Sequence, residues 1–315
     1  MFNIKMSNDR HLSLPSTNRE EIQERIAAMY QQERTNYARH DYMNMRDSED
    51  GETNNEGNTR NRVSLECREK ICEWSYRVVD HFGIDREVVL TSWNFIDRFL
   101  STQQECNTTL FKLLAMTSLL LASKLYGSRR LSMQYLVELS RSEFSVGHMM
   151  QMEVLLLRTL KWHVHPPTVK AVIRDLLGLL SPMVDDVVLK KVSEYAHFFA
   201  ELSVYDMSLV GVEAADIALA SLLNALNWID ESDLSDSVRL SFIEGACCIL
   251  KTDHACEDIQ FVEKKLWEVY SKTEECALSS ATCTHEEPVS KRQRREDGDR
   301  SPITVMSTTP YFAVH

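Results

Sequence analysis

The chain has 315 residues, of which 43% are hydrophobic and 26% are charged, a composition typical of soluble globular proteins. Its length is enough for two domains of ordinary size. The net charge of −12 argues against a protein that coats nucleic acid, because that role needs clustered positive charge. Lysines interrupt the longest apolar run, at 110–126, which argues against insertion into a membrane. The sequence therefore predicts neither a nucleic-acid partner nor a membrane-inserted segment.

The first sixty residues are predicted to hold one helix between two irregular segments. Residues 1–16 show no periodicity, whereas residues 17–43 carry apolar side chains at helical spacing, with Thr17 and Glu20 in the pattern of a capping box. Residues 44–62 are acidic, rich in Asn and Gly and nearly free of apolar side chains, which predicts a flexible linker. Separated in this way, the helix must dock on the rest of the protein or on a partner.

Two helical units of similar length are predicted after the linker, and Pro166 and Pro167 mark the joint between them. For the first unit, 63–165, the apolar periodicity predicts helices at 65–81, 85–102, 110–126, 132–139 and 145–160. For the second, 166–272, it predicts helices at 167–179, 184–201, 212–226, 235–250 and 259–270. Alternating β-branched patterns are few and Asn-Gly hairpin signals are missing, so the predicted fold class is all-α.

The two units share a pattern. WNFIDRFLS before LAMTSLLLASKL in the first matches EYAHFFAELS before AADIALASLLNAL in the second, in each case an aromatic-rich helix followed by a buried helix rich in small residues. Similarity at this spacing indicates a tandem duplication rather than a solenoid, whose repeats are shorter.

The tail, residues 273–315, lacks periodicity and is predicted to be disordered. It holds a basic cluster of the kind that directs nuclear import, formed by Lys291, Arg292, Arg294 and Arg295. Ser301 and Thr309 each precede a proline, the minimal pattern for proline-directed kinases. The tail therefore predicts a protein found in the nucleus as well as the cytoplasm, with two candidate phosphorylation sites.

The first unit resembles the cyclin box. Five residues of the family's core signature occur in order and in their local motifs (CREKICEW, IDRFLS, LLASK and QMEVLLLRTLKW among them): Arg68, Asp97, Leu113, Lys124 and Glu153. The second unit is similar to the more divergent C-terminal cyclin repeat, and the segment 17–43, ending in DYM, is similar to the family's N-terminal helix. The resemblance implies two tandem cyclin-fold repeats of about five helices each, plus an N-terminal docking helix.

The resemblance also implies two pairs of charged residues. Arg68 and Asp97 would form a structural pair that braces the first helix of the cyclin box against the second. Lys124 and Glu153 would lie together on the surface that receives the regulatory helix of a cyclin-dependent kinase, donating to and accepting from its main chain. The alternative is a mutual salt bridge between Lys124 and Glu153 with no partner role.

Two further groups of residues complete the implied sites. Four match positions that cyclins present to the kinase, although their residue types alone would place them in the core: Leu121, Leu125, Leu157 and Val164. A substrate-docking groove would involve Arg68, Ile71 and Trp74. Because Lys70, Arg77 and Lys112 add positive charge around this groove, we expect weak or altered recognition of the basic-x-leucine motif that some cyclins bind.

The sequence thus predicts a non-catalytic, activating subunit of a cyclin-dependent serine/threonine kinase that controls cell-cycle progression. Its partners would be the kinase catalytic subunit and, through the groove, substrates or inhibitors. Gly-rich nucleotide loops, nucleophile elbows and metal-ligand spacings are missing from the sequence, so no enzyme activity, cofactor or metal is predicted. QMEVLLLRTLKW has a D-type character that favours a cyclin acting early in the cycle.

Three alternatives stay open. A basal transcription factor of the IIB type shares the tandem fold. That alternative predicts a basic face and usually an N-terminal zinc ribbon, and both are missing from this sequence. A cyclin-fold scaffold would bind proteins without activating a kinase. A transcription-linked cyclin would prefer the tail of RNA polymerase as its substrate.

Overall fold

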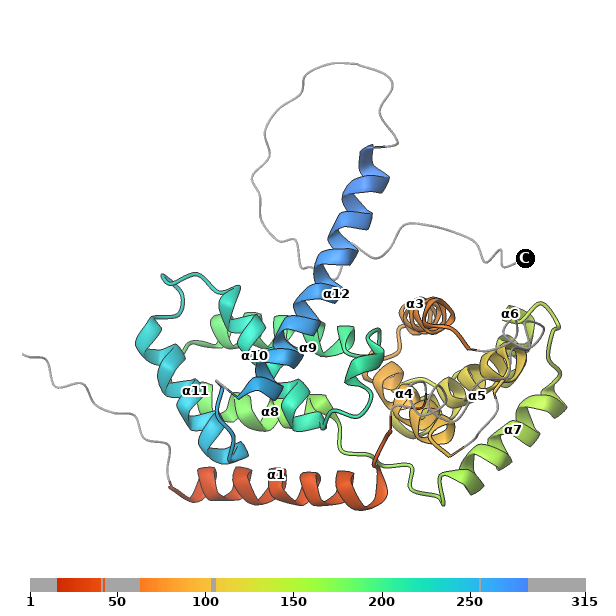
Figure 1. Ribbon diagram of the computed structural model, residues 1–315, viewed down its shortest axis with the longest axis horizontal. Coiled ribbons are helices and arrows are strands. Elements are labelled where there is room, and N and C mark those ends of the chain that lie inside the picture. Colours follow the sequence, from red (N-terminus) through yellow and green to blue (C-terminus); the bar gives the residue numbers. More distant parts are fainter. Residues whose placement is uncertain (1–15, 41, 43–62, 103–105, 255, 283–315) are drawn as a thin grey trace, which may run out of the picture.

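Eleven α-helices and no β-strand make up the part of the chain that the computed structural model describes, which is residues 16–40, 42, 63–102, 106–254 and 256–282. The predicted all-α class is therefore confirmed. Two helical bundles lie next to each other, and the N-terminal helix runs along the second of them with its C-terminal end at the joint (Figure 1).

The first bundle is built around a buried helix. It contains α3 (Leu65–Phe82), α4 (Glu87–Leu100), α5 (Thr108–Tyr126), α6 (Met133–Leu139) and α7 (Val146–Thr159), and the ends of these helices differ from the predicted ones by no more than two residues. The central helix, α5, packs against α3, α4 and α7. Although α5 is long and apolar enough to cross a membrane, most of it is buried in this bundle, and its apolar composition follows from that position.

The second bundle repeats this plan. It contains α8 (Val169–Leu180), α9 (Asp186–Leu202), α10 (Ala214–Asn227), α11 (Asp236–Leu250) and α12 (Glu257–Thr282). Helix α10 takes the place of α5, since it is almost wholly buried and packs against α8, α9, α11 and α12. The shared pattern of the two units therefore has a structural counterpart, a small-residue-rich helix enclosed by its neighbours.

The last helix is longer than predicted. It continues to Thr282, whereas the sequence placed its end at residue 270 and the start of the tail at 273. Residues 271–282 contain no glycine or proline to stop a helix, and they include the good helix formers Glu, Ala and Leu. The predicted import cluster and both phosphorylation sites lie outside the described residues.

The N-terminal helix is shorter than predicted. It spans Ser16–Asn36 instead of reaching residue 43, and the described residues that follow it, 37–40 and 42, are not helical. The reason lies in tertiary packing, because both tyrosines that follow are drawn into the first bundle. The guanidinium of Arg98 lies 4.7 Å from the ring centre of Tyr37, and the buried Tyr42 hydroxyl donates to Asp97 at 3.1 Å. The predicted linker, 44–62, lies outside the described residues.

Ion pairs cross the joint between the bundles. Arg86, just before α4, contacts Glu201 near the end of α9, with 2.5 Å between Nη1 and Oε2. Lys170 of α8 contacts Asp85 at 2.6 Å. Burial raises the pKa of Glu201 to about 7, against the opposing effect of Arg86. The arginine is thus what favours the charged form of this carboxyl group at the joint.

The turn after α5 has no room for a side chain. A Cβ atom on Gly127 would lie 2.6 Å from the carbonyl oxygen of Arg129 and 2.7 Å from that of Ser123, so the backbone would have to move. We expect Gly127→Ala to lower the free energy of unfolding by about 1–3 kcal/mol in urea denaturation. The control is Gly147→Ala in α7, where the new Cβ would lie 3.6 Å from Ser145 Oγ, an ordinary contact, and helix propensity improves. Equal stability of the two variants would contradict this account of the turn.

Candidate functional site

A lysine and a glutamate meet on the surface of the first bundle. Lys124 lies in the last turn of α5 and Glu153 in the middle of α7, and the packing of these two helices brings Nζ of one to 2.5 Å from Oε1 of the other. The lysine side chain is 38% exposed and the glutamate 16%. An ammonium has three donors and a carboxylate about four acceptor sites, so this single bond uses only part of what the pair can offer.

Apolar side chains lie on the surface beside the pair, but only two of the four predicted residues are among them. Leu125 is exposed and Leu157 is half-buried, as a contact surface requires. Leu121 and Val164 are buried in the core of the first bundle, so the expectation that they lie on the surface is wrong for their side chains. For Leu121 the cause is the enclosure of α5 by its neighbours, since residues 114–123 are all buried and Lys124 is the next exposed residue. Leu113 is partly buried against the same core.

Helix α7 adds apolar residues that sequence reasoning missed. Met150 and Val154 are exposed and lie three residues before and one after Glu153, on the same face of the helix as Leu157. In the sequence, the signal for this apolar face was the spacing of Met150 and Leu157, three residues before and four residues after Glu153. Within the part of the chain that the structure describes, the most exposed large apolar side chain is Trp162 at 69%, just beyond the end of α7. Its backbone φ of 62° is an unfavourable conformation for a tryptophan.

Arg68 and Asp97 form a pair deep in the molecule. Arg68 is 1% exposed, and its Nη1 and Nη2 donate to the two carboxylate oxygens of Asp97 at 2.6 and 3.1 Å. The same guanidinium donates to the Tyr42 hydroxyl at 2.7 Å and to the carbonyl of Val204 in the second bundle at 3.0 Å, and lies 4.2 Å from the ring centre of Trp93. Arg68 therefore joins the N-terminal segment and both bundles at one point.

This burial corrects the predicted docking groove, because the Arg68 side chain cannot contact a bound peptide. A pocket of about 170 Å³ does exist beside the other two predicted residues, and it is lined by Ile71, Trp74, Lys112, Met116, Leu139, Ser140, Arg141, Glu143 and Phe144. Lys112 lies 3.4 Å from Glu143, so part of the positive charge expected here is balanced. The acidic partner comes from the turn before α7, and no sequence pattern indicated that this turn lies beside α5.

A second pocket, of about 890 Å³, lies at the joint between α1, α8 and α9. Its charged side chains include partners of opposite sign, such as Lys190 with Glu194 at 3.7 Å and Lys170 with Glu87 at 3.5 Å. Among the described residues, no group of three or more His, Cys, Asp or Glu side chains is placed to hold a metal ion.

The architecture is that of a tandem all-helical protein with one buried helix in each repeat. Residues 24–165 match the family described as "Cyclin, N-terminal domain", so this part of the chain is a cyclin N-terminal domain. A viral cyclin from herpesvirus saimiri has the same fold, with a TM-score of 0.54 at 18% identity over 67% of this chain and 89% of that structure.

Relatives in sequence agree with this assignment. Cyclin-D3-3 of Arabidopsis thaliana is 33% identical over 105 residues, which are 32% of this chain and 29% of that protein. Cyclin-A2-1 of Oryza sativa subsp. japonica is 24% identical over 67% of this chain and 41% of its own length, and the G1/S-specific cyclin-D1 of Danio rerio is 26% identical over 60% and 64%. The matches thus span less than two thirds of each relative. The D-type names among them give modest support to the predicted D-type character.

Proposed function

We propose that this chain is the activating, non-catalytic subunit of a cyclin-dependent serine/threonine kinase and that it controls cell-cycle progression. The observation that carries the proposal is the Lys124–Glu153 pair, held between α5 and α7 at an open surface with exposed apolar side chains on the same helices. The match of residues 24–165 to the cyclin N-terminal domain supports a regulatory role, and the G1/S-specific name of one relative supports a role in the cell cycle.

The proposed mechanism is a population shift. The surface formed by Lys124, Leu125, Glu153 and Leu157 would bind the mobile helix of the kinase in its inward position. That position completes the lysine–glutamate pair of the kinase that holds the phosphates of ATP, and frees the activation loop for phosphorylation. A partner shifts such an equilibrium only through its greater affinity for one state, so contacts to the inward helix supply the free energy.

The mutual bond between Lys124 and Glu153 fits this role. Each side chain holds the other in place before a partner arrives, which reduces the entropy lost on binding. On binding, the ammonium can donate to carbonyl groups and the carboxylate can accept from N–H groups that a helix end leaves unpaired. The mutual bond is therefore compatible with a partner role.

The first test is recovery of kinase activity with the tagged full chain from dividing cells. We expect the wild type to bring down an active proline-directed kinase, and Lys124→Ala/Glu153→Ala to bring down at least about tenfold less activity. The matched control is Lys191→Ala/Asp233→Ala, which removes an ion pair, 2.8 Å long, between α9 and the turn before α11 in the second bundle. Both double variants should stay folded, since surface pairs contribute only about 0–1 kcal/mol.

Two outcomes would contradict the proposal. One is a wild type that brings down no kinase, and the other is a Lys124→Ala/Glu153→Ala variant as active as the control. Either result would favour the scaffold alternative.

We also propose that the protein enters the nucleus by means of the basic cluster at residues 291–295, in addition to residing in the cytoplasm. The support is the sequence KRQRR within an otherwise acidic chain. A fluorescent fusion in which Lys291 and Arg292 are replaced by alanine should lose nuclear signal relative to the wild type. An unchanged distribution would refute this assignment.

A further inference from the structure

The buried helix of the second bundle lacks a cap of its own. The first N–H groups of any helix need acceptors from outside it. In the first bundle Asn107 meets this need for α5, since its side chain accepts from the N–H of Leu110 at 2.8 Å. At the same position before α10 stands Glu213, whose side chain makes no capping bond and instead pairs with Arg34 of α1.

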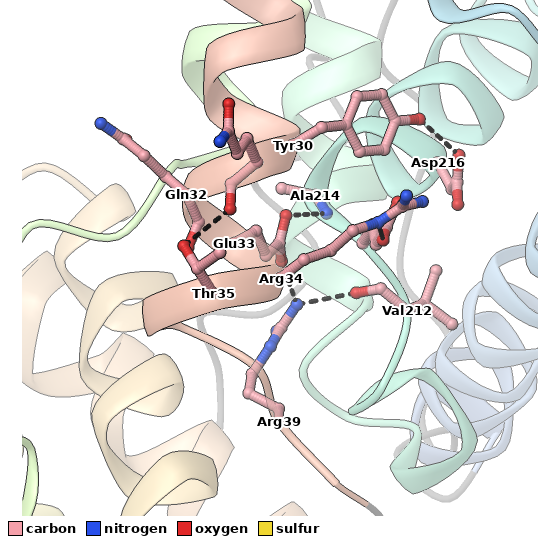
Figure 2. A network of polar contacts seen from close by, with 11 residues as sticks. Tyr30, Gln32, Glu33, Arg34, Thr35, Arg39, Val212, Ala214 and Asp216 are labelled. Carbon is pink, nitrogen blue, oxygen red and sulfur yellow. Dashed lines mark hydrogen bonds and ion pairs between the residues drawn. The ribbon is translucent and has the colours of Figure 1, made fainter.

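The missing acceptor comes from the N-terminal helix. Oε2 of Glu33 accepts the backbone N–H of Ala214, the first residue of α10, at 2.9 Å (Figure 2). Oε1 of the same carboxylate accepts from Nη2 of Arg39 at 2.8 Å, and that nitrogen also donates to the carbonyl of Val212 at 2.7 Å. Glu33 is buried although α1 lies at the surface of the bundle.

Neighbouring contacts hold the same stretch of α1 on the same end of α10. The Tyr30 hydroxyl donates to Oδ1 of Asp216 at 3.0 Å, one turn along from the Glu33 contact (Figure 2). Burial raises the pKa of Glu33, while Arg39 and the N–H of Ala214 favour its charged form. Loss of these partners would leave a buried carboxylate without hydrogen bonds, which costs free energy.

We propose that Glu33 is a positioning residue that caps α10 from another part of the chain, so that docking of α1 and order in the first turn of α10 depend on each other. We call residues 16–40 and 42 the strap. Because Tyr37 and Tyr42 of the strap pack on the first bundle, the strap links the two repeats through this cap. Such coupling is reciprocal, so loosening either end must loosen the other. The inference does not depend on any kinase partner.

The test is amide hydrogen exchange of the full-length chain at residues 214–217. With Glu33→Ala, we expect these amides to exchange about two- to thirtyfold faster, the range expected for loss of a helix cap. Glu33→Gln keeps an acceptor but not the charge and should give a smaller increase. The control is Glu24→Ala on the exposed face of the same helix, which should change nothing.

A second substitution separates capping from general loss of docking. Glu213→Ser places a good capping residue directly before α10. Combined with Glu33→Ala, it should restore slow exchange at residues 215–217, because a serine in this position accepts the second or third N–H of the helix. Along α1 exchange should be fast in this double variant, because the contact of Glu33 with Arg39 is missing and the pair of Arg34 with Glu213 is lost as well. Unchanged exchange at 214–217 in Glu33→Ala, or no restoration by Glu213→Ser, would overturn the proposal. If Glu33→Ala does not fold, the comparison of Glu33→Gln with and without Glu213→Ser decides it in the same way.

Discussion

Replacing Arg68 with alanine is expected to lower the free energy of unfolding by about 3–5 kcal/mol, the usual cost of removing one partner of a buried ion pair. The change would leave the carboxylate of Asp97 buried with only the Tyr42 hydroxyl as a side-chain donor among the contacts described above. It would also remove the bond to Val204 in the second bundle and the contact with Trp93. Chemical denaturation measured by circular dichroism gives the quantity directly.

Two controls sharpen this prediction. Lys191→Ala removes one partner of an exposed pair with Asp233 and should cost no more than about 1 kcal/mol. Arg68→Lys keeps the charge but not the two-pronged geometry, so it should recover only part of the loss. A cost below about 1 kcal/mol for Arg68→Ala would show that the pair is not the structural link between the bundles.

The sequence was most informative about the helices between residues 65 and 250. Their apolar faces are continuous and their ends carry caps or turn residues, so the predicted and observed ends agree closely. It was least informative at the two outer helices. Tyr37 and Tyr42 continue an apolar pattern that looks helical, yet both pack on the first bundle, which only tertiary structure reveals. The sequence at the end of helix α12 contains no glycine or proline that would stop the helix, so its end could not be predicted from apolar periodicity.

At the candidate site, too, some features could be predicted from the sequence and others could not. The resemblance to cyclins, rather than residue spacing, placed Lys124 beside Glu153, and the structure brings them together. Burial was harder to predict, because one turn separates the enclosed Leu121 from the exposed Leu125 on the same helix. The contact of Glu33 with Ala214 left no signal at all in the sequence, since the two residues are 181 positions apart.

The second large effect is expected from exchanging the two charges of the surface pair. In Lys124→Glu/Glu153→Lys the mutual ion pair can still form, so the free energy of unfolding should change by less than about 1 kcal/mol. A partner, however, would meet an acceptor where it needs a donor and a donor where it needs an acceptor, and like polar groups facing each other cost several kcal/mol. We therefore expect activation of the bound kinase to fall by about a hundredfold or more.

The most direct measurement of the central claim is the kinase activity that this exchanged variant supports, compared with the wild type at matched concentrations of folded protein. The account predicts an intact, equally stable protein that no longer activates the kinase. Full activity in the exchanged variant would mean that Lys124 and Glu153 serve only each other, and it would contradict the proposed role of this surface.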